Sequence, residues 1–186
     1  MASKFEWRLF LLNLSRTIQT AELPDLARFL FLCSASAVID DAMTSISHAE
    51  ARATAAAYDF TGINTLMDVA GGHGLLLATV LRQHKAMRGV LFDLPHVAAG
   101  AAATFARAGV TGRVRIESGD FFKELPSGAD AIVMKHIIHD WDDESSVRIL
   151  QTCHRALGSR GKVLILDSVV PPGNTPHFGK LLDLQC

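Results

Sequence analysis

The sequence lacks an excess of charge of either sign. Eighteen Lys and Arg side chains stand against nineteen Asp and Glu, which gives a formal net charge of −1 over 186 residues. Proteins that bind nucleic acid or an anionic membrane surface usually carry a basic excess. The balance therefore argues against both of these partners and favours a small molecule or another protein.

Long apolar runs and a cysteine framework are missing as well. The apolar stretches at Leu9–Leu12 and Phe29–Cys33 fall far short of the roughly 20 residues that span a membrane, and neither ends in a signal-peptide cleavage site. The cysteines at positions 33, 153 and 186 stand far apart and without metal-ligand spacing, as expected for free thiols in a reducing compartment. We therefore predict a cytoplasmic protein without disulfides.

The composition changes near residue 62. Before it, the chain is rich in Ala, Leu and Phe, with apolar residues at helical spacing between Leu23 and Leu30, and the Ala-rich stretch Ser45–Tyr58 favours a further helix. The apolar faces exceed what so short a segment can bury alone. We therefore expect the helical segment 1–61 to pack on the following domain or on a second subunit. Core helices of the same domain are the alternative.

From Asn64 onward, short apolar strands alternate with helices. Strands are expected at Thr65–Ala70, Gly89–Leu94, Val114–Gly119, Ala131–Ile137 and Lys162–Val170, and helices at Leu75–His84, Pro95–Ala108 and Glu144–Leu157. This alternation predicts right-handed crossovers and a parallel sheet with helices on both faces. The predicted fold class is α/β, a Rossmann-like doubly wound sheet in a domain that spans residues 62–186.

A glycine-rich loop and an acidic residue stand where such sheets bind ligands, at the carboxyl ends of the first two strands. The loop runs from Asp68 through Gly71 and Gly72 to Gly74, and its glycines let the backbone approach a ligand closely. Asp93 closes the second strand, where a carboxylate can accept both hydroxyls of a ribose. A glycine loop alone often serves only as a tight turn, but the two features together predict a nucleoside-containing cofactor.

The loop also distinguishes between nucleoside cofactors. Leu77 stands where a dinucleotide fingerprint needs its third glycine, and the G-K-[ST] of a phosphate loop is absent from the sequence. Asp68 would repel a pyrophosphate but could hold a cationic amino-acid group, which favours S-adenosyl-L-methionine. Asp120, at the end of the third strand, could reach the adenine amino group while Phe121 covers the ring.

The segment Met134–Glu144 runs from the fourth strand into a helix. Its acids Asp142 and Asp143 are explained as the cap and first turn of that helix. His139 lies at the turn, on the ligand side of the sheet, where an imidazole suits a general base for a phenolic or similar hydroxyl; a structural histidine is the alternative. We expect no metal site with His136, because strand residues three apart face opposite sides.

Five stretches in order resemble the caffeate and hydroxyindole type of class I O-methyltransferase. They are AYDFTGINTLMDVAGGHG (57–74), LFDLPHV (91–97), SGDFF (118–122), MKHIIHDWDDE (134–144) and LILDSVVPPG (164–173), within a resemblance that covers roughly Ile39 to Asp183. The resemblance implies that S-adenosyl-L-methionine is contacted by Gly71–Gly74, Asp93, Leu94, Asp120, Phe121 and Lys135. It also implies that His139 is the catalytic base and that Asp167 stands where the family carries a glutamate that orients this histidine.

Two residues and the chain length depart from the family pattern. Ala70 replaces the first glycine of D-x-G-G-G-x-G, which we expect to be tolerated, and Asp167 is one methylene shorter than the usual glutamate, which would weaken its hold on His139. Family members carry a longer helical N-terminal domain that dimerises and continue past residue 186. The resemblance thus implies a chain truncated at both ends, a homodimer in the full-length form, and an uncovered sheet edge after the fifth strand.

The predicted function is transfer of a methyl group from S-adenosyl-L-methionine to a hydroxyl of a small aromatic molecule, with His139 as general base. Three alternatives stay open. The chain could bind the cofactor yet lack complete substrate walls, a related enzyme could methylate nitrogen or carbon or use the sulfonium cofactor only as a structural group, or the helices could form a non-enzymatic interaction module. The acceptor itself is not predicted by the sequence.

Overall fold

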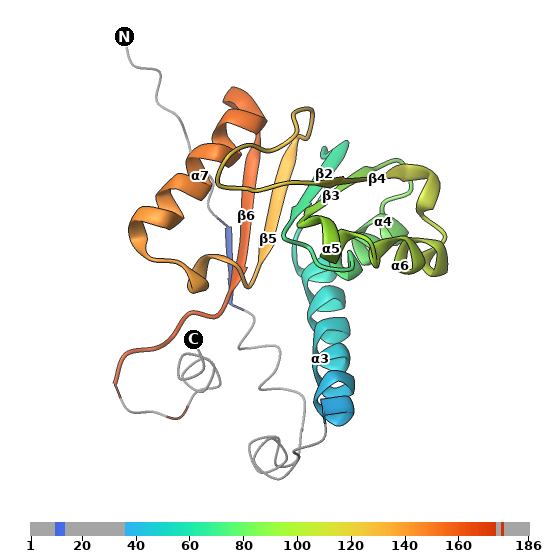
Figure 1. Ribbon diagram of the computed structural model, residues 1–186, viewed down its shortest axis with the longest axis horizontal. Helices are drawn as coiled ribbons and strands as arrows, with labels where there is room; N and C mark the ends of the chain where they lie inside the picture. The colour runs from blue at the N-terminus through green and yellow to red at the C-terminus, as the bar shows by residue number, and fades with distance from the viewer. Residues whose placement is uncertain (1–9, 14–35, 174–175, 177–186) are drawn as a thin grey trace.

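A parallel sheet with helices on both faces organises the chain, as seen in a computed structural model that describes residues 10–13, 36–173 and 176, with side chains from residue 47 onward (Figure 1). In the described part of the chain six strands pair in the order β1-β6-β5-β2-β3-β4, every pair parallel. The strands are β1 (Phe10–Asn13), β2 (Thr65–Val69), β3 (Arg88–Asp93), β4 (Val114–Ser118), β5 (Ala131–Lys135) and β6 (Lys162–Asp167). The predicted doubly wound α/β fold is confirmed.

Helices cover both faces of this sheet. They are α3 (Ser36–Ala57), α4 (Leu75–Gln83), α5 (Pro95–Ala98), α6 (Ala101–Ala108) and α7 (Asp143–Leu157), with 3-10 turns η1 (Thr111–Arg113), η2 (Ile138–Asp140) and η3 (Gly158–Arg160). In Figure 1, α7 lies on one side of the sheet and α4 and α6 lie on the other. None of the helices in the described ranges is both long enough and apolar enough to cross a membrane.

The strand alternation divides the buried side chains between two cores. Leu66 of β2 belongs to the core under α3, α4 and α6, whereas Met67 and Val69 belong to the core under α7, where they meet Ile149. Because side chains along a strand alternate between faces, Asp68 shares the α4 face with Leu66. The carboxyl group of Asp68 therefore lies at the border of this apolar core, near the carboxyl end of β2.

All five strands predicted from the sequence end earlier than expected, and two of them, β2 and β5, stop just before a residue with left-handed backbone. β2 ends at Val69 because Ala70 has a φ of 54°, and β5 ends at Lys135 because His136 has a φ of 56°. Such a backbone cannot continue an extended strand. The turns that follow aim the glycine loop and the 136–141 segment across the carboxyl edge of the sheet.

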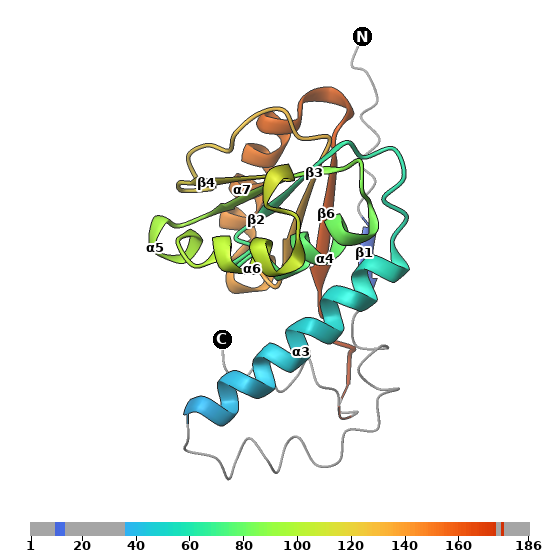
Figure 2. The same ribbon diagram turned by 90° about the vertical axis from the view of Figure 1, so that its right-hand side faces the viewer.

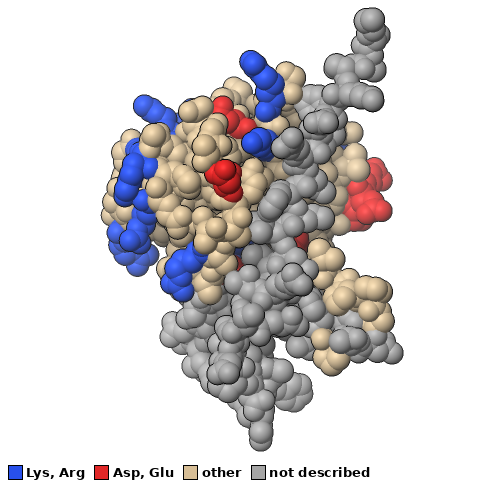
Figure 3. All heavy atoms as spheres, turned by 180° about the vertical axis from the view of Figure 1, so that it is seen from behind, with Lys and Arg blue, Asp and Glu red and all other residues tan. Residues whose placement is uncertain are grey.

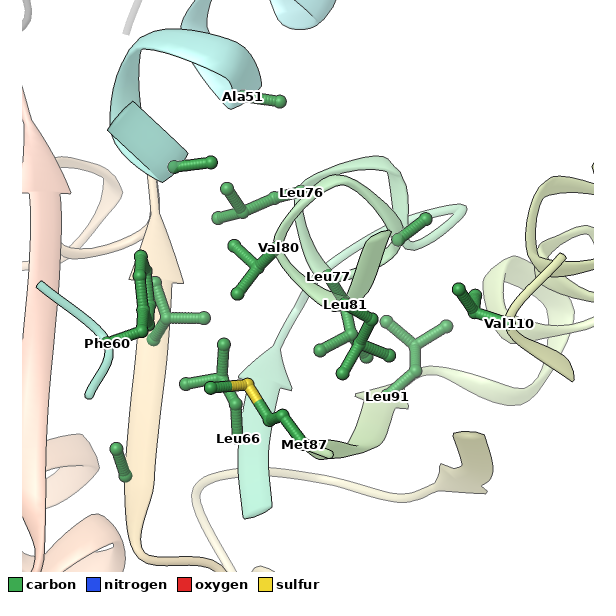
Figure 4. Close-up of a cluster of buried hydrophobic side chains, with 14 of the residues drawn as sticks. Ala51, Phe60, Leu66, Leu76, Leu77, Val80, Leu81, Met87, Leu91 and Val110 are labelled. Carbon is green, nitrogen blue, oxygen red and sulfur yellow. The ribbon is translucent and has the colours of Figure 1, made fainter. Parts of the chain in front are cut away.

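The long helix α3 joins the core through its C-terminal part. It confirms the helix expected over Ser45–Tyr58 and begins earlier, at Ser36. Figure 2 shows α3 projecting past the sheet, and Figure 4 shows its Ala51 above Leu76 and Val80 of α4. Side chains on both sides of position 62 thus share one core, and the domain boundary at that position stays a prediction.

Strand β1 differs from the helical interpretation of residues 1–61. Its four residues pair with β6, from Phe10 opposite Leu164 to Asn13 opposite Asp167. An open edge of β6 would leave backbone N–H and C=O groups unpaired, and a strand satisfies them where a helix cannot. The helical interpretation is therefore wrong for these residues, and so is the expected uncovered edge. The apolar stripe between Leu23 and Leu30 lies outside the described residues.

Candidate functional site

A cleft of about 1020 Å³ opens at the carboxyl end of β2. It is lined by Ser47 and His48 of α3, by Asp68 and Ala70–His73, by Arg82 of α4 and Arg107 of α6, and by Lys135–Ile137 at the carboxyl end of β5. Seen from behind in Figure 3, Lys and Arg side chains gather on the side of the molecule that carries α4 and α6. Since β2 lies between β5 and β3, the cleft occupies the switch point where doubly wound sheets bind ligands.

A smaller hollow lies along the outer face of α7. It measures about 430 Å³ and is lined by Val147, Leu150, Gln151, His154 and Arg155. Its lining contains neither a carboxylate nor a glycine loop, so the chemistry of the site belongs to the larger cleft.

The three predicted glycines have different reasons to be glycine. A Cβ at Gly71 would lie 2.5 Å from Cγ of Asp68, and one at Gly74 would overlap the Phe105 ring. Gly72 has a φ of 60°, and no atom lies within 4 Å of where its Cβ would stand. Gly71 and Gly74 therefore permit tight packing of the loop, while the backbone of Gly72 faces open space that a ligand can enter.

Ala70 takes the strained position of this loop. Its φ of 54° lies in the left-handed region that glycine adopts freely, while its N–H donates to the Phe92 carbonyl at 2.8 Å. The departure from the family glycine is thus tolerated at a conformational cost of about 1 kcal/mol.

Replacing Ala70 with glycine is expected to raise the free energy of unfolding by about 0.5–1 kcal/mol, because the strain disappears. Urea unfolding of the purified chain measures this change. Ala102→Gly on the exposed side of helix α6 is the matched control and should lower the same quantity by about 1 kcal/mol. A loss of stability in Ala70→Gly would show that the left-handed backbone is not strained.

Asp68 is a buried carboxyl group of the site. It is 1% exposed, and its Oδ2 atom has no hydrogen-bond partner in the described part of the chain. Burial raises its pKa to about 7, against the Leu77 backbone N–H and the charge of Lys135, which lower it. An orphaned carboxylate oxygen on the wall of a cleft is a place for a cationic or N–H donor group of a ligand.

Asp93 ends β3 and Asp120 follows β4, and neither of them lines the cleft itself. Asp93 accepts the Gly72 N–H on Oδ2 at 2.8 Å and the Leu94 N–H on Oδ1 at 2.7 Å, which ties the glycine loop to β3. Leu94 itself is 48% exposed. Asp120 accepts the Phe122 N–H at 2.9 Å. Both carboxylates keep lone pairs for a ligand, because each oxygen can accept more than one hydrogen bond.

Phe121 belongs to an aromatic cluster that joins the turns after β4 and β5. Its ring centroid lies 4.9 Å from that of Phe122 and 6.0 Å from that of Trp141, which meets it edge-on. The Arg148 guanidinium lies 5.2 Å from the Phe122 ring centroid. The cluster thus fixes the 120–122 turn to the start of the α7 segment.

His139 and Asp167 are brought together as the resemblance implies. The Nδ1–H of His139, on η2, donates to Oδ1 of Asp167 at 2.7 Å. Burial would raise the pKa of Asp167, but hydrogen bonds from His136, His139 and the Ser168 N–H outweigh it and hold that pKa at about 2. The shorter aspartate therefore still reaches the imidazole. On the other side of the ring, Nε2 of His139 lies 3.2 Å from Oδ1 of the half-exposed Asp140.

Glu50 on α3 is a residue of this site that the sequence did not reveal. It is buried, and its Oε2 lies 2.9 Å from Nζ of Lys135, while Nε2 of His136 lies 3.2 Å from its Oε1. The predicted cofactor contact Lys135 thus lines the cleft with its ammonium already paired. The available signal was that Glu50 is the single acidic residue of the alanine-rich stretch Ser45–Ala57.

His136 lies nearer to His139 than the sequence predicts. β5 ends before it, so the two rings are not on one strand, and their centroids are 5.7 Å apart. His136, His139 and Asp167 offer ligand atoms within 4.8 Å of one another, and the argument that they face opposite sides was wrong. Hydrogen bonds that His136 donates to Asp167 and Glu50 raise its pKa to about 9, so a proton occupies the ring that a metal ion would need.

Comparison with known proteins agrees with this geometry. The sequence model of one protein family, described as the O-methyltransferase domain, matches residues 33–185. The chain is 43% identical over 151 residues to phenazine O-methyltransferase PhzM of Lysobacter antibioticus, which covers 81% of this chain and 44% of PhzM. It is 39% identical over 135 residues to aclacinomycin 10-hydroxylase RdmB of Streptomyces purpurascens, which covers 72% and 36% of the two chains.

Solved structures give the same picture. CalO1, a methyltransferase in calicheamicin biosynthesis in its SAH-bound form, superposes with a TM-score of 0.71 at 41% identity, over 84% of this chain and 46% of CalO1. NcsB1, an O-methyltransferase from neocarzinostatin biosynthesis in complex with S-adenosylmethionine and 2-hydroxy-5-methyl naphthoic acid, gives 0.61 at 35% identity, over 70% and 41%. The chain spans less than half the length of each of these four proteins.

Proposed function

The chain belongs to the O-methyltransferase domain family, and on that premise we propose that it transfers a methyl group from S-adenosyl-L-methionine to a hydroxyl of a small aromatic molecule. The observation that carries the proposal is the hydrogen-bonded pair of His139 and Asp167, placed beside a cleft at the switch point of the sheet. A histidine held by a carboxylate is the arrangement of a general base.

The cofactor of this family fits the cleft. S-Adenosylmethionine or its product is bound in related structures, and Oδ2 of Asp68, which has no hydrogen-bond partner among the described residues, would supply the acceptor that its ammonium group needs. Gly71, Gly72 and Gly74 would let it approach the backbone, and Asp93, Leu94, Asp120, Phe121 and Lys135 would complete its site. When bound, S-adenosylmethionine supplies an activated methyl group. The residues of the chain hold and orient it.

His139 acts on the acceptor in this proposal. Asp167 accepts the Nδ1–H, which fixes the tautomer and leaves Nε2 to take the proton of the acceptor hydroxyl. Asp140, which lies 3.2 Å from Nε2 and whose side chain is 51% exposed, is free to turn toward water as the hydroxyl arrives. Alignment of the hydroxyl oxygen accounts for most of the acceleration, since such a displacement needs little covalent help.

The names of the relatives favour a flat aromatic acceptor. One relative is a phenazine O-methyltransferase, and the NcsB1 complex holds a hydroxynaphthoic acid. The similarity to RdmB, a hydroxylase by name, supports a second candidate, a chain of the same family with an activity other than methyl transfer. His139 favours transfer. The homodimer of the full-length form stays a prediction.

Binding of S-adenosylhomocysteine tests the proposal. Asp93→Ala should weaken the affinity between tenfold and about a hundredfold, because the loss of a carboxylate that accepts hydrogen bonds costs roughly 1.5–3 kcal/mol. Calorimetric titration of the purified chain measures this, with Asp59→Ala, an exposed aspartate before β2, as control. A folded wild-type chain that binds no S-adenosylhomocysteine would contradict the proposal.

A further inference from the structure

A continuous row of charged side chains connects α3 to the His139–Asp167 pair. Glu50 lies 3.2 Å from Nε2 of His136, the Nδ1 of His136 lies 3.7 Å from Oδ1 of Asp167, and the same Oδ1 accepts the Nδ1–H of His139 at 2.7 Å. The row joins residues from α3, the turn after β5, the end of β6 and η2. Asp167 Oδ1 also accepts the Ser168 N–H at 2.9 Å, so its direction is fixed from several sides.

The row is balanced in charge although it is largely buried. Glu50 would be costly to bury alone, yet its pKa lies below the usual value: burial opposes the shift, and hydrogen bonds and charges from His136 and Lys135 outweigh it. With His136 and Lys135 cationic, Glu50 and Asp167 anionic, the four charges cancel. Buried ion networks contribute little net stability but do define geometry, since removing one member leaves an uncompensated charge.

The backbone of His136 supports a functional reason for this row. Its φ of 56° is costly for a side chain with a Cβ, and its N–H donates to the Leu166 carbonyl at 2.9 Å, which holds it there. Strain of this kind persists where the surrounding structure requires it, often at functional sites. Here the left-handed turn places the imidazole between the two carboxylates.

We propose that Glu50 and His136 are positioning residues for the proposed catalytic base: the His136 imidazolium, held by Glu50 of α3, orients Asp167, and Asp167 orients His139. The inference rests on the proposed function. It gives α3 a role in catalysis besides lining the cleft, because the position of that helix sets the direction of the carboxylate that holds His139.

Nuclear magnetic resonance of the histidine rings tests the coupling without any acceptor. Long-range ¹H–¹⁵N spectra report the protonation and tautomer of each imidazole, and the signals are assigned by their loss in His136→Gln and His139→Gln. The groups facing His136 are Glu50, Lys135, Asp167 and His139. In Glu50→Gln, the titration midpoint of His136 should fall by at least about one pH unit, and His139 should lose its single Nδ1–H tautomer.

Turnover tests the consequence, with 2-hydroxy-5-methyl naphthoic acid as the acceptor probe. Glu50→Gln should lower kcat about tenfold, because the base is misdirected, and leave KM for S-adenosylmethionine within about threefold, because the glycine loop is unchanged and Lys135, the cofactor contact that Glu50 touches, keeps its charge. Glu50→Asp, which keeps the charge, should recover part of kcat. Arg52→Gln, an exposed change on the same helix, should match the wild type.

The outcomes separate the inference from the proposed function. An unchanged His136 midpoint and an unchanged His139 tautomer in Glu50→Gln would overturn the inference, whether or not the wild type is active. If Glu50→Gln does not fold, His136→Gln provides the same test. An unchanged His139 tautomer in that variant would overturn the inference. Coupled rings in a wild-type chain that binds no S-adenosylhomocysteine would support the geometry and refute the methyltransferase function.

Discussion

Replacing His139 with glutamine is expected to lower kcat for methyl transfer by about 10²- to 10⁴-fold, the range that removal of a general base produces. Glutamine is similar in size and keeps a polar group near Asp167. The substitution therefore removes the proton-accepting nitrogen of His139 and leaves the local packing largely unchanged. Because His139 does not line the described cleft, the affinity for S-adenosylhomocysteine should stay within about twofold. Initial rates with a phenolic acceptor and calorimetric titration of each variant measure the two quantities.

The control for this prediction is His154→Gln, on the outer face of α7, which should change neither quantity. If His139→Gln kept more than a tenth of the wild-type kcat, His139 would not be the base. The neighbouring Asp140 would then be the next group to test, since it lies 3.2 Å from Nε2 of His139. A parallel fall in cofactor affinity would instead indicate that the substitution disturbs the cleft.

The strands and their succession along the chain were predictable because local patterns set them, whereas their order in the sheet was not predicted. Each of the strands β2 to β6 was found within a few residues from its apolar run, and the crossover rule then determined the direction of the chain. The meeting of His139 and Asp167 followed in part from this order. β5 and β6 are neighbours, so residues that follow their carboxyl ends lie side by side.

The rest of the site depends on features that the sequence does not display locally. Ala70 and His136 have a left-handed backbone that residues with a Cβ adopt infrequently. The sequence therefore predicted that β2 and β5 extend too far. Glu50 meets Lys135 across 85 positions of chain, and only the docking of α3 brings them together. The formation of β1 likewise depends on the open edge of β6. The short apolar run in the sequence does not by itself indicate that this edge is available for pairing.

Asp68 links the proposed cofactor site to the stability of the chain. Burial raises its pKa from 3.8 to about 7, so between these pH values the folded chain binds the proton that the unfolded chain releases. The contribution of Asp68 to the free energy of unfolding must then fall as the pH rises from about 4 to about 7, and it stays low above that. The shift corresponds to a loss on the order of 4 kcal/mol.

Asp68→Asn is therefore expected to make the ligand-free chain more stable at pH 8 while it damages the cofactor site. Asparagine removes the buried charge and thereby the loss of about 4 kcal/mol. A buried amide without a hydrogen-bond partner costs about 1–3 kcal/mol, so the net increase in the free energy of unfolding is roughly 1–3 kcal/mol. The affinity for S-adenosylhomocysteine should fall at least about tenfold, because the ammonium group loses its anionic acceptor.

Urea unfolding of both proteins at several pH values between 5 and 8 measures the stability difference, and calorimetric titration measures the affinity. The difference between Asp68→Asn and wild type should grow with pH, because only the wild type must give up the Asp68 proton, whereas the titrations of His136 and Asp167 are common to both. Asp59→Asn, an exposed aspartate before β2, should show no such trend.

An Asp68→Asn variant that is less stable than wild type at pH 8, with full cofactor affinity, would show that the Asp68 carboxyl is a structural group. The expected opposite signs would instead mean that the chain keeps a buried carboxylate at the expense of stability because the cofactor needs it.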